Sequence, residues 1–422
     1  MAVDPRQVLA GILTITMFVM LGNMIKRDHF DSVQNKFPGG QEDLFQDNSK
    51  ISEQSLVSLD GGGSDSGPWK EDSQGLKPCW PKPDLEEVQE SKGYVMVSLR
   101  NGPEFHVSQI ADAVVVAKSL GATLVLPDIR GNKPGETRHF REIYNVEKFV
   151  KSLDGVVRVA KEPPEELLTR HPTVVKIPNR LTQDQVLEDV EPVFRKTGHV
   201  RVVTHFSSVN MKKRESTSVD SVVCLAMFGA LELQPEVQEV VNSMVGRLRT
   251  LSRKSDGRFI AVDLRVDILE KKGCQSNGGT GTKGCYSPQE IAEFLMKIGF
   301  DKDTTIYLTQ TKWHSSLDAL KDVFPKTYTK ESIMPVDKKG KFLGSDAVEF
   351  EEAIDFNICS QSDVFVPAIS GLFYANVAGK RIASGRTEIL VPAQISGSSA
   401  PASKFLSTYV TRKNHFAYSC FC

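Results

Sequence analysis

Residues 258–267 read RFIAVDLRVD, an apolar run that ends in one arginine and two carboxylates. Alternation along an extended strand would place Asp263, Arg265 and Asp267 on the same side. In an open α/β sheet, the carboxyl ends of the strands form the edge where ligands bind. A guanidinium at that edge can hold a phosphate through two parallel hydrogen bonds. The segment therefore predicts an α/β protein with a phosphate-binding arginine, Arg265, although mutual pairing of the three charges is an equally simple interpretation.

Strand and helix patterns alternate on both sides of this segment. Upstream, the pattern predicts strands at 93–99, 123–127 and 201–206 and helices at 105–120 and 235–251. Downstream, it predicts a helix that starts with the capping box Ser287-Pro288-Gln289-Glu290, helices at 315–323 and from about 346, and strands at 305–308, 327–329 and 363–367. Such alternation predicts two Rossmann-like domains, residues 93–251 and 252–422, that face each other across a cleft.

The composition is that of a globular protein with room for two cores. The chain has 422 residues, and 52 basic residues nearly balance 53 acidic ones, which leaves a formal net charge of -1. A near-neutral chain without a Lys/Arg block has no general attraction to nucleic acid. We therefore expect no nucleic-acid partner.

The first 92 residues differ from the rest. Residues 8–25 form an almost uncharged apolar run at the short end of what spans a bilayer. They predict a transmembrane signal anchor behind a short tail, residues 1–7; a cleaved signal peptide is the alternative. Residues 26–92 are polar and rich in glycine, which predicts a disordered stem. The short leading tail and large trailing body favour a type II orientation with the body in the lumen.

Seven cysteines fit an oxidising lumen. Cys274 and Cys285 bracket a glycine-rich loop, and we predict a disulfide between them, with two free thiols as the alternative. Cysteine spacing for zinc is absent from the sequence. Asp301-Lys302-Asp303 has the D-x-D spacing that holds a metal in many sugar transferases, but aspartate is also common in such turns. We expect no metal and no organic cofactor.

A second candidate site follows the last predicted strand. Ser370, Gly371, Leu372 and Phe373 lie between that strand and a helix, where backbone N–H groups and the helix dipole attract anions. An ordinary strand-to-helix turn is the alternative interpretation. Asp355, on the preceding helix, is a candidate acceptor for a ribose or base, or else a solvated helix carboxylate.

From Gly93 to about Thr387 the chain resembles the plant O-fucosyltransferase-like proteins, and within them the MANNAN SYNTHESIS-RELATED group of cell-wall assembly. The order and spacing of several segments carry this resemblance: 93–95, 118–127, 260–267 with Cys274, 305–308, 324–325, 329–331, 362–367 and 379–381. The resemblance implies a Golgi type II glycosyltransferase with two Rossmann-like domains (GT-B type). It also implies metal-independent, inverting transfer from a GDP-sugar to a polysaccharide acceptor in mannan or glucomannan synthesis, with a mannan synthase as an expected partner.

The resemblance also implies roles for residues. The family's H-x-R segment falls on Asp263-Leu264-Arg265, so that Arg265 would hold the diphosphate. Asp355 and the Ser370–Phe373 turn match the positions that cradle the guanosine and the phosphates.

Two departures from the family pattern leave alternatives open. Asp263 stands where the family has histidine, and the G-G-x-N-Q loop reads Asn101–Phe105 and keeps only Gly102. Glu104 in that loop is a candidate base for the acceptor hydroxyl, or a loop carboxylate that faces water. Besides mannan synthesis, the chain could therefore transfer fucose to another glycan, or act as a catalytically silent partner of a synthase.

Overall fold

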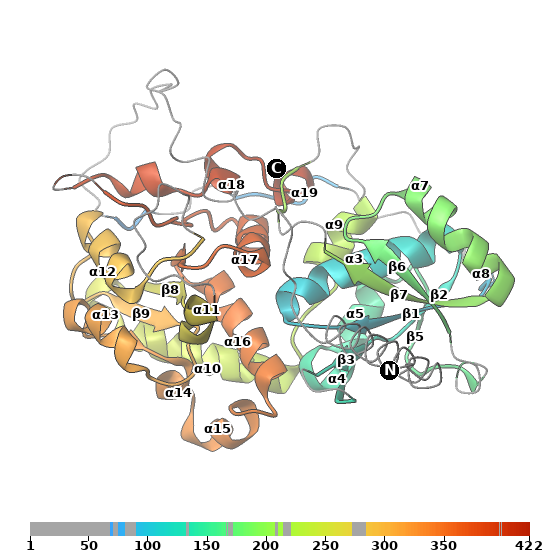
Figure 1. Cartoon of the computed structure of the whole chain (residues 1–422), viewed down its shortest axis with the longest axis horizontal. Helices are drawn as coiled ribbons and strands as arrows, with labels where there is room; N and C mark the ends of the chain where they lie inside the picture. Colours follow the sequence, from blue (N-terminus) through green and yellow to red (C-terminus); the bar gives the residue numbers. More distant parts are fainter. Residues whose placement is uncertain are drawn as a thin grey trace, which may run out of the picture. The chain divides into compact units, whose positions relative to one another are not determined.

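The computed structural model describes residues 68–70, 75–80, 90–131, 135–165, 167, 172–206, 210–213, 221–271, 284–395, 397 and 399–422 (Figure 1). All of them belong to one compact unit, Gly40–Cys422. The predicted tail and anchor, residues 1–25, and most of the predicted stem lie outside the described residues. Among the helices of the described part, none combines the length and hydropathy that a membrane span requires.

The first sheet is built around the buried strand β1 (Tyr94–Leu99), which pairs in parallel with β2, β3 and β7. The strand β4 is antiparallel to β3, whereas β5 and β6 extend the sheet in parallel beside β2 and β7. The other strands of this sheet are β2 (Thr123–Val125), β3 (Asp128–Arg130), β4 (Thr137–His139), β5 (Val159–Ala160), β6 (Thr173–Pro178) and β7 (His199–His205).

The second sheet is fully parallel, in the order β10-β9-β8-β11. Its strands are β8 (Phe259–Asp263), β9 (Thr305–Leu308), β10 (Thr327–Tyr328) and β11 (Val364–Pro367). Every residue of β8, β9 and β11 is buried, as expected for a parallel sheet covered on both faces. Two mainly parallel sheets with intervening helices confirm the predicted α/β class.

Helices follow most of the strands. In the first half they are α3 (Pro103–Leu120), α4 (Phe140–Ile143), α5 (Val146–Ser152), α7 (Gln183–Gln185), a π-helical turn (Val186–Val190), α8 (Glu191–Thr197), α9 (Ser221–Phe228) and α10 (Pro235–Leu251). In the second half they are α11 (Val266–Lys271), α12 (Pro288–Lys297), α13 (Asp318–Val323), α14 (Lys330–Ile333), α15 (Val336–Phe342), α16 (Val348–Gln361), α17 (Leu372–Ala383), α18 (Thr408–Thr411) and α19 (Ala417–Cys420). The capping box predicted at Ser287 and Glu290 is present at the start of α12.

Helix α3 joins the two halves. It packs against β1, β2 and β7 of the first sheet and also against α9, α16 and α17. Contact on so many sides explains why its sequence is buried nearly all round and shows little amphipathic pattern. It starts two residues earlier than predicted, because Pro103 suits the first helical position, and it ends at Gly121 in the left-handed conformation. Glu104, in its first turn, accepts a hydrogen bond from Asn376 of α17, so this turn lies against the helices of the second sheet.

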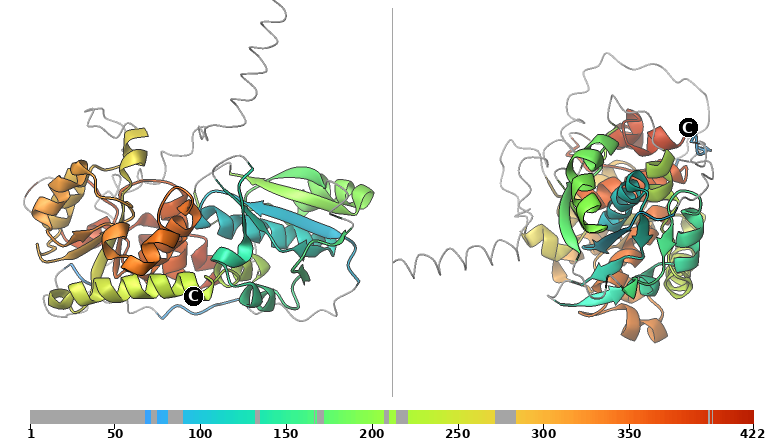
Figure 2. Two further views of the ribbon diagram at one scale, coloured as in Figure 1. Left: turned by 90° about the horizontal axis from the view of Figure 1, so that it is seen from below. Right: turned by 90° about the vertical axis from the view of Figure 1, so that its right-hand side faces the viewer.

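Two segments cross the predicted domain boundary at residue 251. Helix α10, which that boundary assigns to the first domain, packs against α14, α16 and β9 of the second sheet (Figures 1 and 2). In the opposite sense, α19 at the carboxyl terminus packs against α9 of the first half. Helix α19 also packs against α17, so it bridges the two halves, whereas α10 lies against the second sheet.

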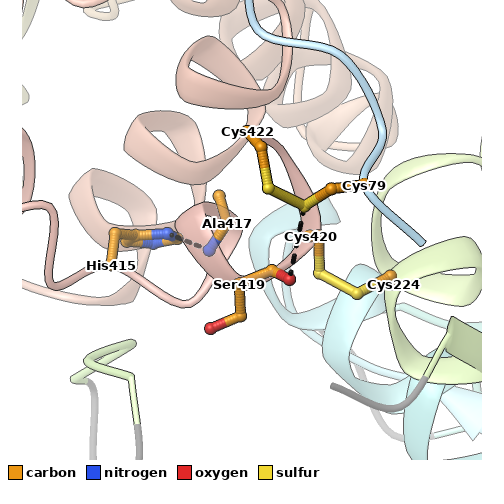
Figure 3. Close-up of a disulfide and its surroundings, with 7 residues drawn as sticks. All are labelled: Cys79, Cys224, His415, Ala417, Ser419, Cys420 and Cys422. Carbon is orange, nitrogen blue, oxygen red and sulfur yellow. Dashed lines mark hydrogen bonds between the residues drawn. A yellow bond between two sulfur atoms is a disulfide. The ribbon is translucent and has the colours of Figure 1, made fainter. Parts of the chain in front are cut away.

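Two disulfides fasten the carboxyl terminus. Cys420 bonds to Cys224 of α9, and Cys422 bonds to Cys79 (Figure 3). The backbone on either side of Pro78 also forms an antiparallel bridge with Phe421. The prediction of a disordered stem over residues 26–92 is therefore wrong for residues 75–80, because a covalent bond and main-chain hydrogen bonds hold this piece.

Candidate active site

Arg265 lies in a short turn between β8 and α11. The strand ends at Asp263 and the helix begins at Val266, so the expectation that Asp267 shares one strand face with Arg265 is wrong. Asp267 sits on α11 and pairs with Lys271 one turn later. The turn is held by Thr309, whose hydroxyl accepts from Leu264 N at 3.0 Å and donates to Asp263 Oδ1 at 3.1 Å. The neighbouring strand β9 thus sets where Arg265 emerges.

The Arg265 side chain is mostly buried, with 22% of its surface exposed. Its Nε lies 3.3 Å from Asp263 Oδ1, and its guanidinium carbon lies 5.2 Å from the centre of the Phe373 ring. Burial acts to lower the pKa of Arg265, but the carboxyls of Asp263, Glu104, Asp355 and Glu352 raise it above its usual range. Of the two interpretations of Arg265, the ion pair with Asp263 is present, and phosphate binding by the charged guanidinium stays a prediction.

Glu104 reaches the same region from the first turn of α3. Its side chain is buried, and among the described residues its Oε2 has no hydrogen-bond partner. Burial raises the pKa of Glu104 to about 7, although Arg265 pulls it down. Asn376 of α17 donates to the Glu104 backbone carbonyl at 2.8 Å and so ties this turn to the second half. The alternative of a loop carboxylate facing water is therefore wrong.

Gly102 makes room for this carboxylate. A Cβ added at Gly102 would lie 2.3 Å from Glu104 Oε2, closer than any real Cβ contact. The Gly102 backbone is extended, with φ at −83°, so the need for glycine comes from this close approach and not from strain. Glycine at position 102 thus has a physical reason in this chain.

Glu352 is a member of the group that the sequence analysis missed. Burial, and then the nearby Glu104, raise the pKa of Glu352 to about 8. It lies in the acidic run at 349–352, which reads as a solvated helix face. Its position three residues before Asp355 could have identified it, because this spacing puts both side chains on one side of α16.

Asp355 is buried in a network of its own. Lys330 Nζ donates to Asp355 Oδ2 at 2.8 Å and to Glu351 Oε2 at 3.0 Å, while Tyr307 OH donates to Asp355 Oδ1 at 2.6 Å. Burial raises the pKa of Asp355 to about 6, against the effect of Lys330 and Tyr307. Both oxygens already accept hydrogen bonds, so its predicted contact with a nucleoside stays a prediction.

The residues of the Ser370–Phe373 turn make different kinds of contact. Ser370 directs both its N–H and its hydroxyl at the carbonyl of Gly284, at 3.0 and 2.8 Å, and not at an open edge. Gly371, at φ of 152°, is the N-cap of α17, which begins at Leu372. Phe373 contributes its ring to Arg265. The predicted phosphate contacts of this turn stay predictions.

Two other predicted features have contacts of their own. Asp303 accepts from Lys254 at 2.6 Å and bonds to Asp301 through its backbone N–H, which is turn chemistry. In the described ranges, no three His, Cys, Asp or Glu side chains converge as a metal site would require. Cys285 is disulfide-bonded, and its predicted partner Cys274 lies outside the described residues.

Comparison with known proteins identifies the family. Residues 94–383 match the model of the family described as O-FucT, GDP-fucose protein O-fucosyltransferase. Protein MANNAN SYNTHESIS-RELATED 1 of Arabidopsis thaliana is 58% identical over 424 residues, with 100% of each chain covered. Protein MANNAN SYNTHESIS-RELATED of Trigonella foenum-graecum is 48% identical over 422 residues, again with 100% of each covered.

A solved structure of POFUT1 in complex with GDP-fucose is similar at 15% identity and a TM-score of 0.45, covering 74% of this chain and 100% of that one. The family match spans more than half of the chain, and full-length relatives share about half or more of its residues. The predicted resemblance and the prediction of a glycosyltransferase are confirmed. The chain belongs to the GDP-fucose protein O-fucosyltransferase family of glycosyltransferases.

Proposed function

We propose that this chain transfers a sugar from a GDP-sugar to a polysaccharide acceptor in mannan or glucomannan synthesis, alongside a mannan synthase. We place it in the Golgi membrane as a single-pass type II protein with its body in the lumen. The names of its full-length relatives support the process. The disulfides that join Cys79, Cys224 and the carboxyl terminus support an oxidising compartment.

The observation that carries the proposal is the setting of Arg265 at the carboxyl edge of β8. A permanent cation is held there by a fixed turn, packed on Phe373 and faced by Glu104 from the other half of the molecule. Charge that develops on a leaving diphosphate is stabilised by such a preorganised donor. Since Arg265 can supply this positive charge, the reaction as proposed needs no metal.

Glu104 is the proposed general base. The oxygen of the acceptor hydroxyl forms a bond to the anomeric carbon of the donor while the bond from that carbon to the phosphate oxygen breaks. The hydroxyl proton passes to the Glu104 carboxylate, and GDP leaves with the electron pair. Attack opposite the leaving group inverts the anomeric centre. A pKa of about 7 for Glu104 suits a base that works near neutral pH.

The number of carboxyls around Arg265 sets a further condition. Asp263, Glu104, Asp355 and Glu352 all act on one guanidinium, and a diphosphate adds more negative charge. Protons must relieve the excess. Burial and the neighbouring Glu104 raise the pKa of Glu352 well above its usual range, so Glu352 can take up a proton beside the diphosphate and leave Glu104 as the ionised partner.

A specific observation favours a second candidate, the catalytically silent partner of a synthase. Ser370 and Asp355, both predicted to contact the nucleotide, already spend polar atoms on Gly284, Lys330 and Tyr307. Fucose transfer to another glycan is the alternative within the enzyme class, and it differs from the proposal in donor and acceptor rather than in Arg265 chemistry.

Titration calorimetry of the full chain with GDP, GDP-mannose and GDP-fucose tests the proposal. Arg265→Ala should weaken GDP binding by about tenfold or more, because it removes charge-assisted hydrogen bonds. Arg258→Ala is a matched control, since Arg258 precedes the same strand at its opposite end and pairs with Asp256. If no nucleotide bound, the silent-partner candidate would replace the transferase. Equal GDP affinity in both variants would remove Arg265 from the donor site.

A further inference from the structure

A hollow on the surface of the second sheet carries a pattern that the proposed reaction does not use. It has a volume of about 400 Å³, and its lining includes Trp313, Lys321, Tyr328, Glu331, Ser332 and Lys339. We call it the Trp313 pocket. Its volume is within the range of small-molecule sites. Two aromatic rings, hydroxyl groups and charges of both signs therefore share one concave surface.

Trp313 is the central feature of this pocket. Within the described ranges it is the only tryptophan, tyrosine or phenylalanine whose side chain is exposed, at 36%. Its ring is nevertheless held in place: the indole N–H donates to Asp318 at 2.9 Å, and Lys321 Nζ lies 4.5 Å from the ring centre. An exposed ring that is already oriented loses little conformational freedom when a ligand packs against it.

The Trp313 pocket lies beside β10, the outer strand of the same sheet whose strand β8 presents Arg265. Trp313 follows β9 in the chain, and the loop between them contains Thr309, which holds the Arg265 turn. Backbone N–H groups of Lys330 and Glu331 donate to the carbonyls of Gln310 and Thr311, which fasten the pocket wall to this loop. Tyr328 is on β10, two strands from β8, so the lateral offset along the sheet is about 10 Å.

We propose that the Trp313 pocket binds a hexopyranose ring of the acceptor polysaccharide, a few sugars away from the ring that receives the new bond. The C–H face of a pyranose is apolar and can pack on Trp313 and Tyr328. Its hydroxyls can bond to Glu331, Ser332 and the two lysines. This inference rests on the proposed function and names how the acceptor is held.

The chemistry of the lining favours a neutral glycan over other ligands. Two lysines and one glutamate leave only a small positive charge, whereas a site for a highly charged ligand would carry a larger excess of one sign. Hydroxyls and charged groups at the rim match a ring whose outer edge is entirely hydroxylated. A nucleobase of the donor could also stack on Trp313, and the experiment below separates the two.

Binding of a mannan hexasaccharide to the full chain, measured by calorimetry without nucleotide, tests the inference. Trp313→Ala should weaken this binding about tenfold and leave GDP binding unchanged. Trp313→Phe keeps an aromatic face and should bind within about threefold of the unaltered chain. Met296→Ala is the matched control, since Met296 is a similarly exposed apolar side chain on α12. It should change neither affinity.

Ser332→Arg provides a second route that leaves the tryptophan in place. Ser332 is exposed at the pocket, and a long side chain there should block the hexasaccharide as strongly as Trp313→Ala does. Unchanged hexasaccharide affinity in both variants would overturn the inference. Weaker GDP binding in Trp313→Ala, with the hexasaccharide unaffected, would also overturn it and assign the pocket to the nucleoside. Arg265→Ala should weaken GDP binding by about tenfold or more and leave hexasaccharide binding unchanged, so that failure of the donor site is distinguishable from failure of this pocket.

Discussion

Replacement of Lys330 by methionine should destabilise this protein in a pH-dependent way. Lys330 is 2% exposed, and its ammonium contacts the carboxylates of Asp355 and Glu351 at 2.8 and 3.0 Å. Methionine nearly preserves the volume of the side chain but removes the positive charge. Two buried carboxylates then lose their counter-charge, and the perturbation tests the electrostatics of the network rather than its packing.

The size of the effect follows from the burial. Removal of one partner from a buried ion pair costs about 3–5 kcal/mol. At roughly 2–4 °C per kcal/mol for large domains, the melting temperature should fall by about 10 °C near pH 8. In the folded chain the pKa of Asp355 is about 6, above the ordinary 3.8, so its contribution to stability is present at low pH and is lost as the pH rises through 6. Loss of Lys330 raises that pKa further, which lets Asp355 take up a proton and lessens the cost at pH 5.

Circular dichroism melting at pH 5 and pH 8 gives the melting temperature of each variant at both pH values. The control is Lys271→Met, because Lys271 is 78% exposed and pairs loosely with Asp267 at 3.6 Å. It should shift the melting temperature little at either pH. An equal loss at both pH values for Lys330→Met, or a loss no larger than that of the control, would refute the account of a buried ionic network.

Three further outcomes are expected. Gly102→Ala should lower turnover about a hundredfold with little change in melting temperature, because its Cβ must displace the flexible Glu104 carboxylate and not the backbone. Glu104→Gln should lower turnover by about 10² to 10⁴ and abolish the rise in rate as the pH increases through about 7, since only the unprotonated base accepts a proton. Loss of the disulfide in Cys224→Ser/Cys420→Ser should cost about 2–5 kcal/mol of stability and leave GDP affinity intact.

Each of these outcomes has its own measurement. Initial rates with a GDP-sugar, together with melting curves, test the expectation for Gly102→Ala. A destabilised but fully active protein would contradict the steric argument. A pH–rate profile tests whether Glu104 is the general base. An unchanged profile in Glu104→Gln would assign the base to another residue. Melting curves under non-reducing conditions test the contribution of the Cys224–Cys420 disulfide to stability. An unchanged melting temperature would show that noncovalent packing around α9 is enough to hold the carboxyl terminus.

Much of the fold was predictable because buried strands and helix caps produce recognisable patterns within short stretches of sequence. The apolar runs at β1, β8, β9 and β11 were predicted within a few residues, and the capping box of α12 was predicted correctly, since each depends on nearest neighbours in the chain. Helix α3 was predicted only in its extent. Its central position was not, because a helix buried on all sides shows no periodicity that points to one partner.

In the candidate site, too, the features that depend on local sequence were predictable and those that depend on long-range packing were not. Arg265 could be chosen from its place after an apolar strand, and the resemblance pointed to Asp263, Asp355 and the turn at Ser370. The sequence could not show that Glu104 comes from the other half of the molecule to the same guanidinium, because the two residues are far apart in the chain and only the packing of α3 against α16 and α17 brings them close. Glu352 was missed for a related reason, since an acidic run reads as solvated until a neighbour covers it.

The linear sequence was enough to establish the α/β class, the strand that presents Arg265 and the family, because hydrophobic period and residue order are properties of the chain. Assembly alone settled which carboxyls share that arginine, how Lys330 engages Asp355, and how Cys79 and Cys224 reach the carboxyl terminus. The pKa of a group depends on the solvent and charges around it. Those surroundings exist only once distant segments have packed together.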